Sequence, residues 1–220
     1  MWEQNSSSWN EDNSVQSINQ SLIISFKHPE EFICRFKAPK LRERIFHFSA
    51  ESIAKLKAKA NKESSSNEIS SFKSLSSLAW RCITRARSLP PDRNTSCKLA
   101  MNNRTKMEPP LPVEYVGNSI HSVSADSTAG ELLEHDLGWA VWKLHLAIVS
   151  HTNRVLLEYL NEWLKSPAVY QHAQFFKTDN VMIGCSPRFN MYGNEFGMGK
   201  AVVVLSGYVN KFHGKVASYL

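Results

Sequence analysis

No apolar stretch of this chain is long enough to span a lipid bilayer. Its apolar runs are far shorter than the roughly eighteen residues that a transmembrane helix needs. The first residues, Met1 to Asn5, also lack the basic start and the apolar core of a secretory signal peptide. We therefore expect a cytoplasmic protein with no membrane among its partners.

Cysteine is scarce, and its spacing excludes two classes of site. The four cysteines, Cys34, Cys82, Cys97 and Cys185, show neither CxxC nor CxxH spacing. A structural zinc site or a disulfide framework normally requires such clusters. We expect reduced, mostly buried thiols and no bound metal.

The usual motifs of phosphate binding and nucleophilic catalysis are also missing. Residues Gly193 to Gly199 match neither the P-loop nor the dinucleotide spacing, and the run that follows them resembles a strand rather than a helix. Cys185 and Ser186 lie before this glycine-rich loop, where reactive groups often occur. However, no G-x-S-x-G elbow surrounds them and no base can be identified. The sequence therefore disfavours a nucleophilic role for either residue.

Basic residues exceed acidic ones, which gives a net charge of +6 and a pI near 9.1. Such a balance permits binding to phosphate groups or nucleic acid. Many of the lysines fall on one predicted helix, at Lys55, Lys57, Lys59 and Lys62, where a solvated face explains them. Because no stacking aromatics alternate with these lysines, we predict no nucleic-acid partner.

Periodicity predicts an α/β domain with a mixed sheet and helices packed on it. Residues 1–21 are polar and are expected to be poorly ordered, 22–40 form a connecting segment, and 41–220 form the domain, whose pattern stops before it is complete. Ser49 is expected to cap a helix whose Ile53 and Leu56 side chains face the protein interior. The other predicted elements are strands at 44–48, 95–101, 119–124, 181–185, 201–205 and 215–219, and helices at 70–87 and from Ser127 or Thr128 to about 164 with a break near Gly138.

On the second helix, the spacing predicts one buried apolar face. This face would consist of Phe72, Leu75, Leu78, Ala79, Cys82, Ile83 and Ala86. The strand at 201–205, Ala-Val-Val-Val-Leu, is expected to be the most buried of the chain.

The histidines offer no catalytic or metal-binding arrangement that the sequence can reveal. His145 and His151 are six positions apart, which places them on different faces of a helix. His47 precedes Glu51 by four residues, where a capping or surface role is favoured over a pair, and His135 is expected at the surface beside Asp136. The remaining four, His28, His121, His172 and His213, have no convincing local partner.

The loop from Ser186 to Lys200 is rich in glycine and aromatic residues. Gly197 and Gly199 flank Met198, which predicts a tight loop whose backbone packs closely against another part of the protein. By itself this pattern indicates a structural loop.

Several blocks together resemble the plant BAHD family of acyl-CoA-dependent acyltransferases. They are, in the order that the family shows, Arg42-Glu43-Arg44-Ile45-Phe46-His47-Phe48-Ser49, Ser74-Leu75-Ser76-Ser77-Leu78-Ala79-Trp80-Arg81, Pro109-Pro110-Leu111-Pro112, Tyr115-Val116-Gly117-Asn118-Ser119, and Ser186-Pro187-Arg188-Phe189 before Glu195-Phe196-Gly197-Met198-Gly199-Lys200. The resemblance covers about Leu22 to Leu220. It implies a two-layer sandwich like that of chloramphenicol acetyltransferase, here the second domain of a two-domain enzyme.

Members of this family have a catalytic HxxxD motif in the first domain and a structural DFGWG motif near the C-terminus. The position four after each of the eight histidines holds Phe32, Glu51, Ala125, Trp139, Val149, Val155, Phe176 or Ala217, so HxxxD does not occur in this chain. The second motif is varied, with Glu195 for aspartate and Met198 for tryptophan. The resemblance implies a structural role for Glu195, Phe196, Gly197, Met198, Gly199 and Lys200, and it assigns no catalytic residue to this chain.

We therefore expect the C-terminal half of an acyl-CoA-dependent O- or N-acyltransferase, inactive by itself. The family uses acyl-CoA as co-substrate and a small alcohol or amine as acceptor, and we expect no bound cofactor. The alternative is a non-catalytic binding or regulatory module that pairs with a full-length relative. A nucleic-acid binder is a third reading that rests on charge alone. Apolar faces that the first domain would cover are expected to favour self-association.

Overall fold

The computed structural model describes residues 28, 40, 42, 44–167, 177–185, 191–193, 195–202 and 215–218. Cys34, His172 and His213, the segment 1–21 and most of 22–40 lie outside these residues. The elements, in chain order, are α1 (Ala50–Glu63), α2 (Ser71–Ala86), β1 (Asn94–Asn102), β2 (Ile120–Thr128), α3 (Ala129–Glu134), α4 (Leu137–Val149), α5 (Asn153–Lys165), β3 (Val181–Cys185), a 3-10 turn (Met191–Gly193) and β4 (Lys215–Ser218).

The described strands form one mixed sheet in the order β2-β1-β3-β4. β1 and β2 run antiparallel, with Cys97 opposite Ala125 and Leu99 opposite Val123. β3 is parallel to β1, and β4 is parallel to β3. The predicted mixed sheet is therefore confirmed.

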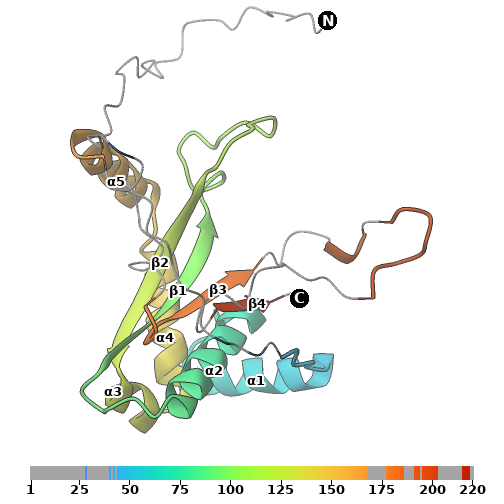
Figure 1. The fold of residues 1–220 in the computed structure, drawn as a ribbon, viewed down its shortest axis with the longest axis vertical. Coiled ribbons are helices and arrows are strands. Elements are labelled where there is room, and N and C mark those ends of the chain that lie inside the picture. Colours follow the sequence, from blue (N-terminus) through green and yellow to red (C-terminus); the bar gives the residue numbers. More distant parts are fainter. Residues whose placement is uncertain are drawn as a thin grey trace, which may run out of the picture.

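The helices α2, α3 and α4 lie together on one side of this sheet (Figure 1). The main core cluster contains Trp80, Cys97, Leu99, Val123, Ala125, Leu132, Ala140, Leu144, Val181 and Ile183. Its strand residues are two positions apart on each strand, so they point to the same side of the sheet, the side on which α2, α3 and α4 lie. This arrangement confirms the predicted class, a sheet with helices packed on it.

A second, smaller cluster holds α1 against α2 and α4. Ala60, Ile69, Leu137 and Val141 form it, with Leu56 and Leu78 packed against them. Leu56 of α1 thus faces inward, as the sequence predicts. The four lysines of α1, Lys55, Lys57, Lys59 and Lys62, are exposed, which confirms their interpretation as a solvated face.

Local capping explains where most of the helices begin. The hydroxyl of Ser49 accepts a hydrogen bond from Ser52 N, and that of Ser70 accepts one from Lys73 N. Thr128 forms a full capping box with Glu131 at the start of α3. Asp136 caps α4 by accepting from Trp139 N at 2.9 Å. These side chains satisfy backbone N–H groups that a helix cannot pair internally.

The strand predicted at 44–48 is wrong. These residues have no regular structure, and Ile45 and Phe46 are 76% and 77% exposed. Alternating polarity favours a strand, but a strand also requires a neighbour that accepts its backbone hydrogen bonds. No described strand pairs with this segment.

The predicted buried face of α2 is also partly wrong. Cys82 and Ala86 are exposed, whereas Trp80 and Thr84 are fully buried together with three serines, Ser74, Ser76 and Ser77. The helix packs on the sheet on one side and on α1 and α4 on another, so small side chains fit where the backbones approach. The hydroxyls of Ser74 and Ser77 donate to the carbonyls four residues earlier, which satisfies them inside the protein.

The long helical region breaks at two places rather than one. The first break comes at His135 and Asp136, slightly before the expected position at Gly138. The second separates α4 from α5 at residues 150–152, where the sequence predicts continuous helix. At this break the His151 ring is buried, and its Nε2 lies 2.9 Å from Asn103 Oδ1. The helix is therefore interrupted where the chain makes a tertiary contact.

The final predicted strands are described only in part. Val181–Cys185 and Lys215–Ser218 are strands, as predicted. Ala201 and Val202 are irregular, and Val202 is 96% exposed, so this part of the predicted buried strand is wrong. Residues 203–205 lie outside the described part. No described helix has both the length and the apolarity that crossing a bilayer requires.

Candidate functional site

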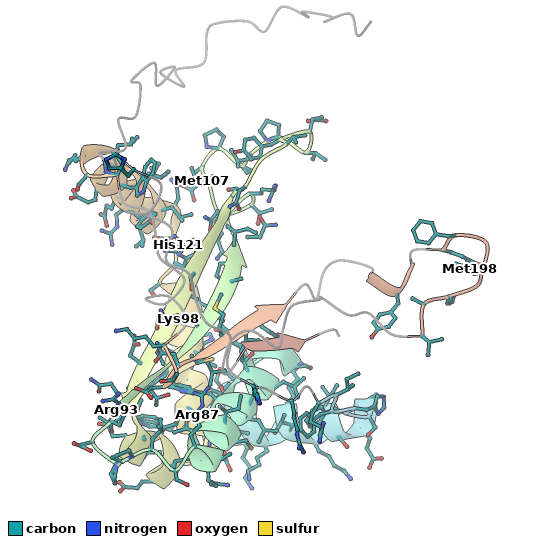
Figure 2. The ribbon with its side chains drawn as sticks, in the orientation of Figure 1. Arg87, Arg93, Lys98, Met107, His121 and Met198 are labelled. Atoms are coloured by element: carbon teal, nitrogen blue, oxygen red, sulfur yellow. The ribbon has the colours of Figure 1, made fainter. Side chains whose placement is uncertain are left out.

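The motif Glu195 to Lys200 lies on an exposed loop that extends away from the sheet, with Met198 far from the helices in Figure 2. Gly197 and Gly199 have φ of +79° and +86°, a region that disfavours other residues, which explains glycine at both positions. The expected close packing is wrong, because a Cβ at either glycine would meet nothing within 4 Å. Phe196 and Met198 are 85% and 88% exposed. The structural role of the motif remains a prediction.

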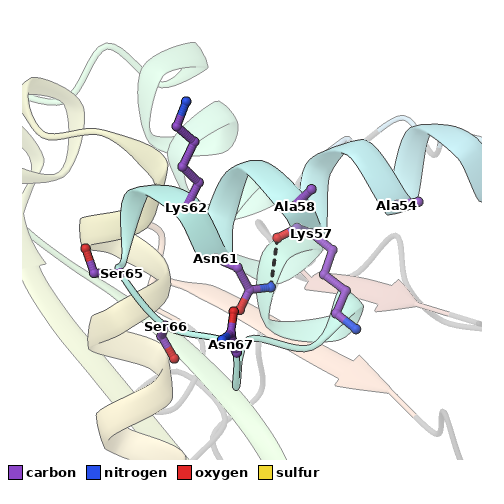
Figure 3. A pocket seen from close by; sticks show the side chains of 8 residues that line it. All are labelled: Ala54, Lys57, Ala58, Asn61, Lys62, Ser65, Ser66 and Asn67. Carbon is purple, nitrogen blue, oxygen red and sulfur yellow. Dashed lines mark hydrogen bonds between the residues drawn. The ribbon is translucent and has the colours of Figure 1, made fainter.

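An open groove of about 740 Å³ runs along α1 and the connection to α2. Figure 3 shows its lining residues, with the Lys57 and Lys62 side chains pointing in opposite directions. Asn61 has a structural role here: its Nδ2 donates to Lys57 O at 2.9 Å and to Ile69 O at 3.1 Å, and its Oδ1 accepts from Ile69 N. Sequence periodicity does not reveal this groove, because one of its walls is the connection between α1 and α2, which hydrogen bonds between Asn61 and Ile69 hold beside α1.

Three ionisable side chains form a cluster beside this groove: Glu68 of the α1–α2 connection, Lys73 of α2 and His145 of α4. Lys73 Nζ lies 2.8 Å from His145 Nδ1 and also donates to Glu68 O at 3.1 Å. On the other side of the imidazole, His145 Nε2 is 3.5 Å from the carboxylate of Glu68. The ring of Trp142 stacks on His145 with centroids 4.7 Å apart. The structure thus brings together a lysine, a histidine and a carboxylate that the sequence did not connect.

Burial controls the protonation of this cluster. It lowers the pKa of His145, and the positive charge of Lys73 lowers that pKa further, while Glu68 opposes the shift. The pKa of Lys73 is also lowered, first by burial, with Glu68 again acting in the opposite direction. The favoured state is therefore a neutral imidazole whose Nδ1 accepts a hydrogen bond from the Lys73 amine.

A second histidine cluster lies where β2 meets the junction of α4 and α5. His121 and His151 stack with ring centroids 5.2 Å apart, and Tyr159 approaches His121 edge-on at 4.5 Å. His151 is buried and contacts Asn103 Oδ1. The expectation that His121 has no partner holds only locally, since its partners come from distant segments. Figure 2 shows His121 on the far part of the β1–β2 hairpin, beside α5.

Acid is expected to destabilise the fold through this histidine pair. Burial is the largest cause that lowers the pKa of His121 and of His151, and His121 and Lys106 lower that of His151 further. The unfolded chain, with an ordinary histidine pKa of about 6.5, then binds more protons, so stability present above about pH 6.5 is lost as the pH falls through the folded-state pKa values. Urea titrations at successive pH values measure this loss.

The matched variant is His121→Phe, which keeps an aromatic ring for stacking and removes one charge. We expect a smaller loss of unfolding free energy between about pH 6.5 and pH 5 than in the unchanged chain. Other acid-sensitive groups contribute equally to both proteins and cancel in the difference. Equal losses in the two proteins would contradict the assignment.

The other candidates from the sequence remain separate from these clusters. His47 is exposed, and Glu51 pairs with Lys55 at 2.7 Å. His135 is exposed and stacks on Trp139, as expected for the surface. Among the described residues, no three His, Cys, Asp or Glu side chains form a group that could hold a metal ion.

Of the two thiols that the structure describes, Cys97 is buried, which raises its pKa, whereas Cys82 is exposed. The prediction of buried thiols is therefore wrong for Cys82. The side chains of Cys185 and Ser186 lie outside the described residues.

Comparisons with known proteins identify relatives along most of the chain. Residues 3–219 match the family described as "Transferase family". The chain is 36% identical to "BAHD acyltransferase DCR" of Arabidopsis thaliana, covering 82% of this chain and 38% of that protein. It is 29% identical to shikimate O-hydroxycinnamoyltransferase of Nicotiana tabacum, covering 81% and 42%. The chain therefore spans about two fifths of the length of these relatives.

The fold is shared with a solved structure. The crystal structure of TRI101 from F. sporotrichioides, complexed with coenzyme A and T-2, aligns with a TM-score of 0.66 at 22% identity. The alignment covers 77% of this chain and 41% of that one. At this identity the likeness concerns the fold alone.

Proposed function

Since the chain belongs to the Transferase family, the plant BAHD acyltransferases, we propose that it forms the C-terminal part of an acyl-CoA-dependent O- or N-acyltransferase. In this proposal residues 41–220 are the second domain. The complete enzyme moves an acyl group from a CoA thioester to the hydroxyl or amine of a small molecule. The match to the family over residues 3–219 is the observation that carries the proposal.

Acyl transfer of this kind depends on a base beside the acceptor. The base removes the proton of the hydroxyl or amine, whose oxygen or nitrogen then attacks the thioester carbonyl and expels the CoA thiolate. A positioned base typically contributes about 10²- to 10⁴-fold to such a step, and holding the reactants together contributes more. In the family the HxxxD histidine serves as this base, and no histidine of this chain has aspartate four residues later.

We also propose that the exposed surfaces of this chain meet the remainder of the enzyme. Phe196 and Met198 on the motif loop are apolar and almost fully exposed. A tight loop that presents such side chains is suited to packing against another domain. This supports a structural role for the motif, consistent with its two glycines at positive φ.

The chain expressed by itself is therefore expected to give no turnover. The test incubates the purified chain with acetyl-CoA or a hydroxycinnamoyl-CoA and a panel of alcohols and amines. Product on the acceptor is quantified by mass spectrometry, since release of free thiol alone would also report acylation of the protein. The positive control is a family member that contains the HxxxD motif. Repeated formation of ester or amide product by the chain alone would overturn the assignment of catalysis to the missing motif.

A further inference from the structure

Lys73 differs from Lys55 and Lys165 in the group that holds its amine. Lys55 and Lys165 lie on exposed helix faces, and each amine is 2.7 Å from a carboxylate oxygen. The amine of Lys73 instead lies 2.8 Å from the Nδ1 atom of His145. Among the described residues, no carboxylate lies within ion-pair distance of this amine; Glu68 offers it a backbone carbonyl oxygen.

The three side chains form a line from nucleophile to base to carboxylate. If Nδ1 of His145 accepts from Lys73, the ring proton resides on Nε2, which faces Glu68 Oε2 at 3.5 Å. This order matches the general requirement for an activated nucleophile, a base within reach and a third group that orients the base. The His145 side chain is only 6% exposed, so packing holds the ring in place.

Lys73 is not fully enclosed by the protein. Lys73 is half-buried, and the Glu68 side chain beside it is 76% exposed. Trp142, which stacks on His145, is 38% exposed and provides an apolar surface next to the cluster. Acylation of Lys73 requires a thioester to approach the cluster from this side.

We propose that Lys73 is a covalent acyl-acceptor site, at which an acyl-CoA thioester forms a side-chain amide with His145 as the base. His145 takes one proton of the Lys73 ammonium, and the amine nitrogen attacks the thioester carbonyl. A C–N bond forms, the C–S bond breaks, and CoA leaves as a thiolate that takes up a proton. The second ammonium proton is lost from the amide nitrogen to solvent. This modification goes beyond the proposed function, since it requires neither the HxxxD motif nor an acceptor molecule.

The lowered pKa of Lys73 supports the proposal, because it increases the fraction of free amine near neutral pH. The physical cause is burial, which penalises the charged form. Lys57, which is exposed on α1, provides the matched control within the same chain.

The experiment incubates the full chain with acetyl-CoA, in the absence of any alcohol or amine acceptor, and follows acetylation of each lysine by peptide mass spectrometry. At about pH 7.5 we expect Lys73 to react at least about a hundredfold faster than Lys57, the low end of what a positioned base contributes. The modification should approach one acyl group per chain. Acylation of Lys73 no faster than that of Lys57 would overturn the proposal, whatever the chain does with added acceptors.

The variant His145→Gln distinguishes catalysis by the His145 base from simple accessibility of the Lys73 amine. His145→Gln keeps a hydrogen-bond acceptor for Lys73 but cannot take up the proton. We expect the rate at Lys73 to fall by about a hundredfold, with the rate at Lys57 unchanged. Far-UV circular dichroism checks that this buried substitution leaves the protein folded. An unchanged ratio of the two rates in a folded variant contradicts the role of His145.

Glu68→Gln tests the same cluster from the solvent side, where folding is not at risk because Glu68 is exposed. The Glu68 charge raises the pKa of Lys73, so its removal lowers that pKa. The midpoint of the acetylation rate against pH is then expected to move to lower pH for Lys73 and to stay in place for Lys57. A midpoint for Lys73 that is unchanged or raised would refute the arrangement.

Discussion

Replacing Trp80 by alanine is expected to lower the free energy of unfolding by about 4 kcal/mol, as is typical of a large aromatic side chain removed from a core. Trp80 is fully buried at the centre of the main cluster, between α2 and the sheet. Its Nε1 donates to Thr95 Oγ1 at 3.1 Å, and Thr95 Oγ1 donates in turn to Asp179 O at 2.7 Å. The indole therefore ties the helix layer to β1 and to the segment before β3.

Urea unfolding followed by far-UV circular dichroism measures this change. Trp80→Phe is the graded control, since it keeps an aromatic ring and most of the volume but removes the N–H donor and part of the buried ring. We expect a loss of about 1–2 kcal/mol. Trp142→Ala is the surface control. Trp142 is 38% exposed and stacks on His145, so its removal should cost only about 1 kcal/mol. If Trp80→Ala lowered the free energy of unfolding by less than the roughly 1 kcal/mol expected for Trp142→Ala, the core would not depend on the Trp80 side chain.

Gly138→Ala is expected to destabilise the protein by about 3 kcal/mol, at the upper end of the usual range for overpacking. A Cβ at this position would lie 2.4 Å from the carbonyl carbon of Glu63 and 2.6 Å from Ser64 N. Both are backbone atoms, so the start of α4 would have to move away from the end of α1. The hydrogen bond from Gly138 N to Glu63 Oε2, 3.0 Å long, would be strained by the same movement.

Gly184→Ala provides the comparison for this prediction. A Cβ at Gly184, in β3, would meet nothing within 4 Å. Alanine also restricts the unfolded chain more than glycine does, so this variant should be neutral or slightly stabilising. Thermal and urea unfolding of the two variants separate the steric cost from the general effect of an added methyl group. Similar stabilities for the two variants would contradict the close contact between α1 and α4.

The groups of the candidate site show where prediction from sequence succeeds and where it fails. The starts of α1, α2 and α3 follow from serine and threonine caps, because each hydrogen bond joins residues three positions apart. By contrast, Lys73 and His145 are 72 positions apart, and no local pattern connects them. The same is true of His121 and His151, which become neighbours only because α4 packs against β2.

The segment 44–48 shows a local pattern that predicts an element which the structure does not contain. Its alternation was a sound reason to expect a strand, yet Ile45 and Phe46 are exposed and irregular. Whether an alternating segment becomes a strand depends on a partner strand beside it, and that partner is a property of the whole fold.

The sequence by itself determined the starts of α1, α2 and α3, the mixed class of the sheet and the family. Caps and periodicity depend on residues close together in the chain, and the order of the motifs is a property of the sequence itself. It also predicted glycine-dependent geometry at 197 and 199, since positive φ is a local requirement. Only the tertiary structure decided that α2 buries serines, that α4 and α5 are separate, and that Lys73 meets His145. These features depend on which surfaces approach each other, and that is set by packing between distant elements rather than by any local pattern.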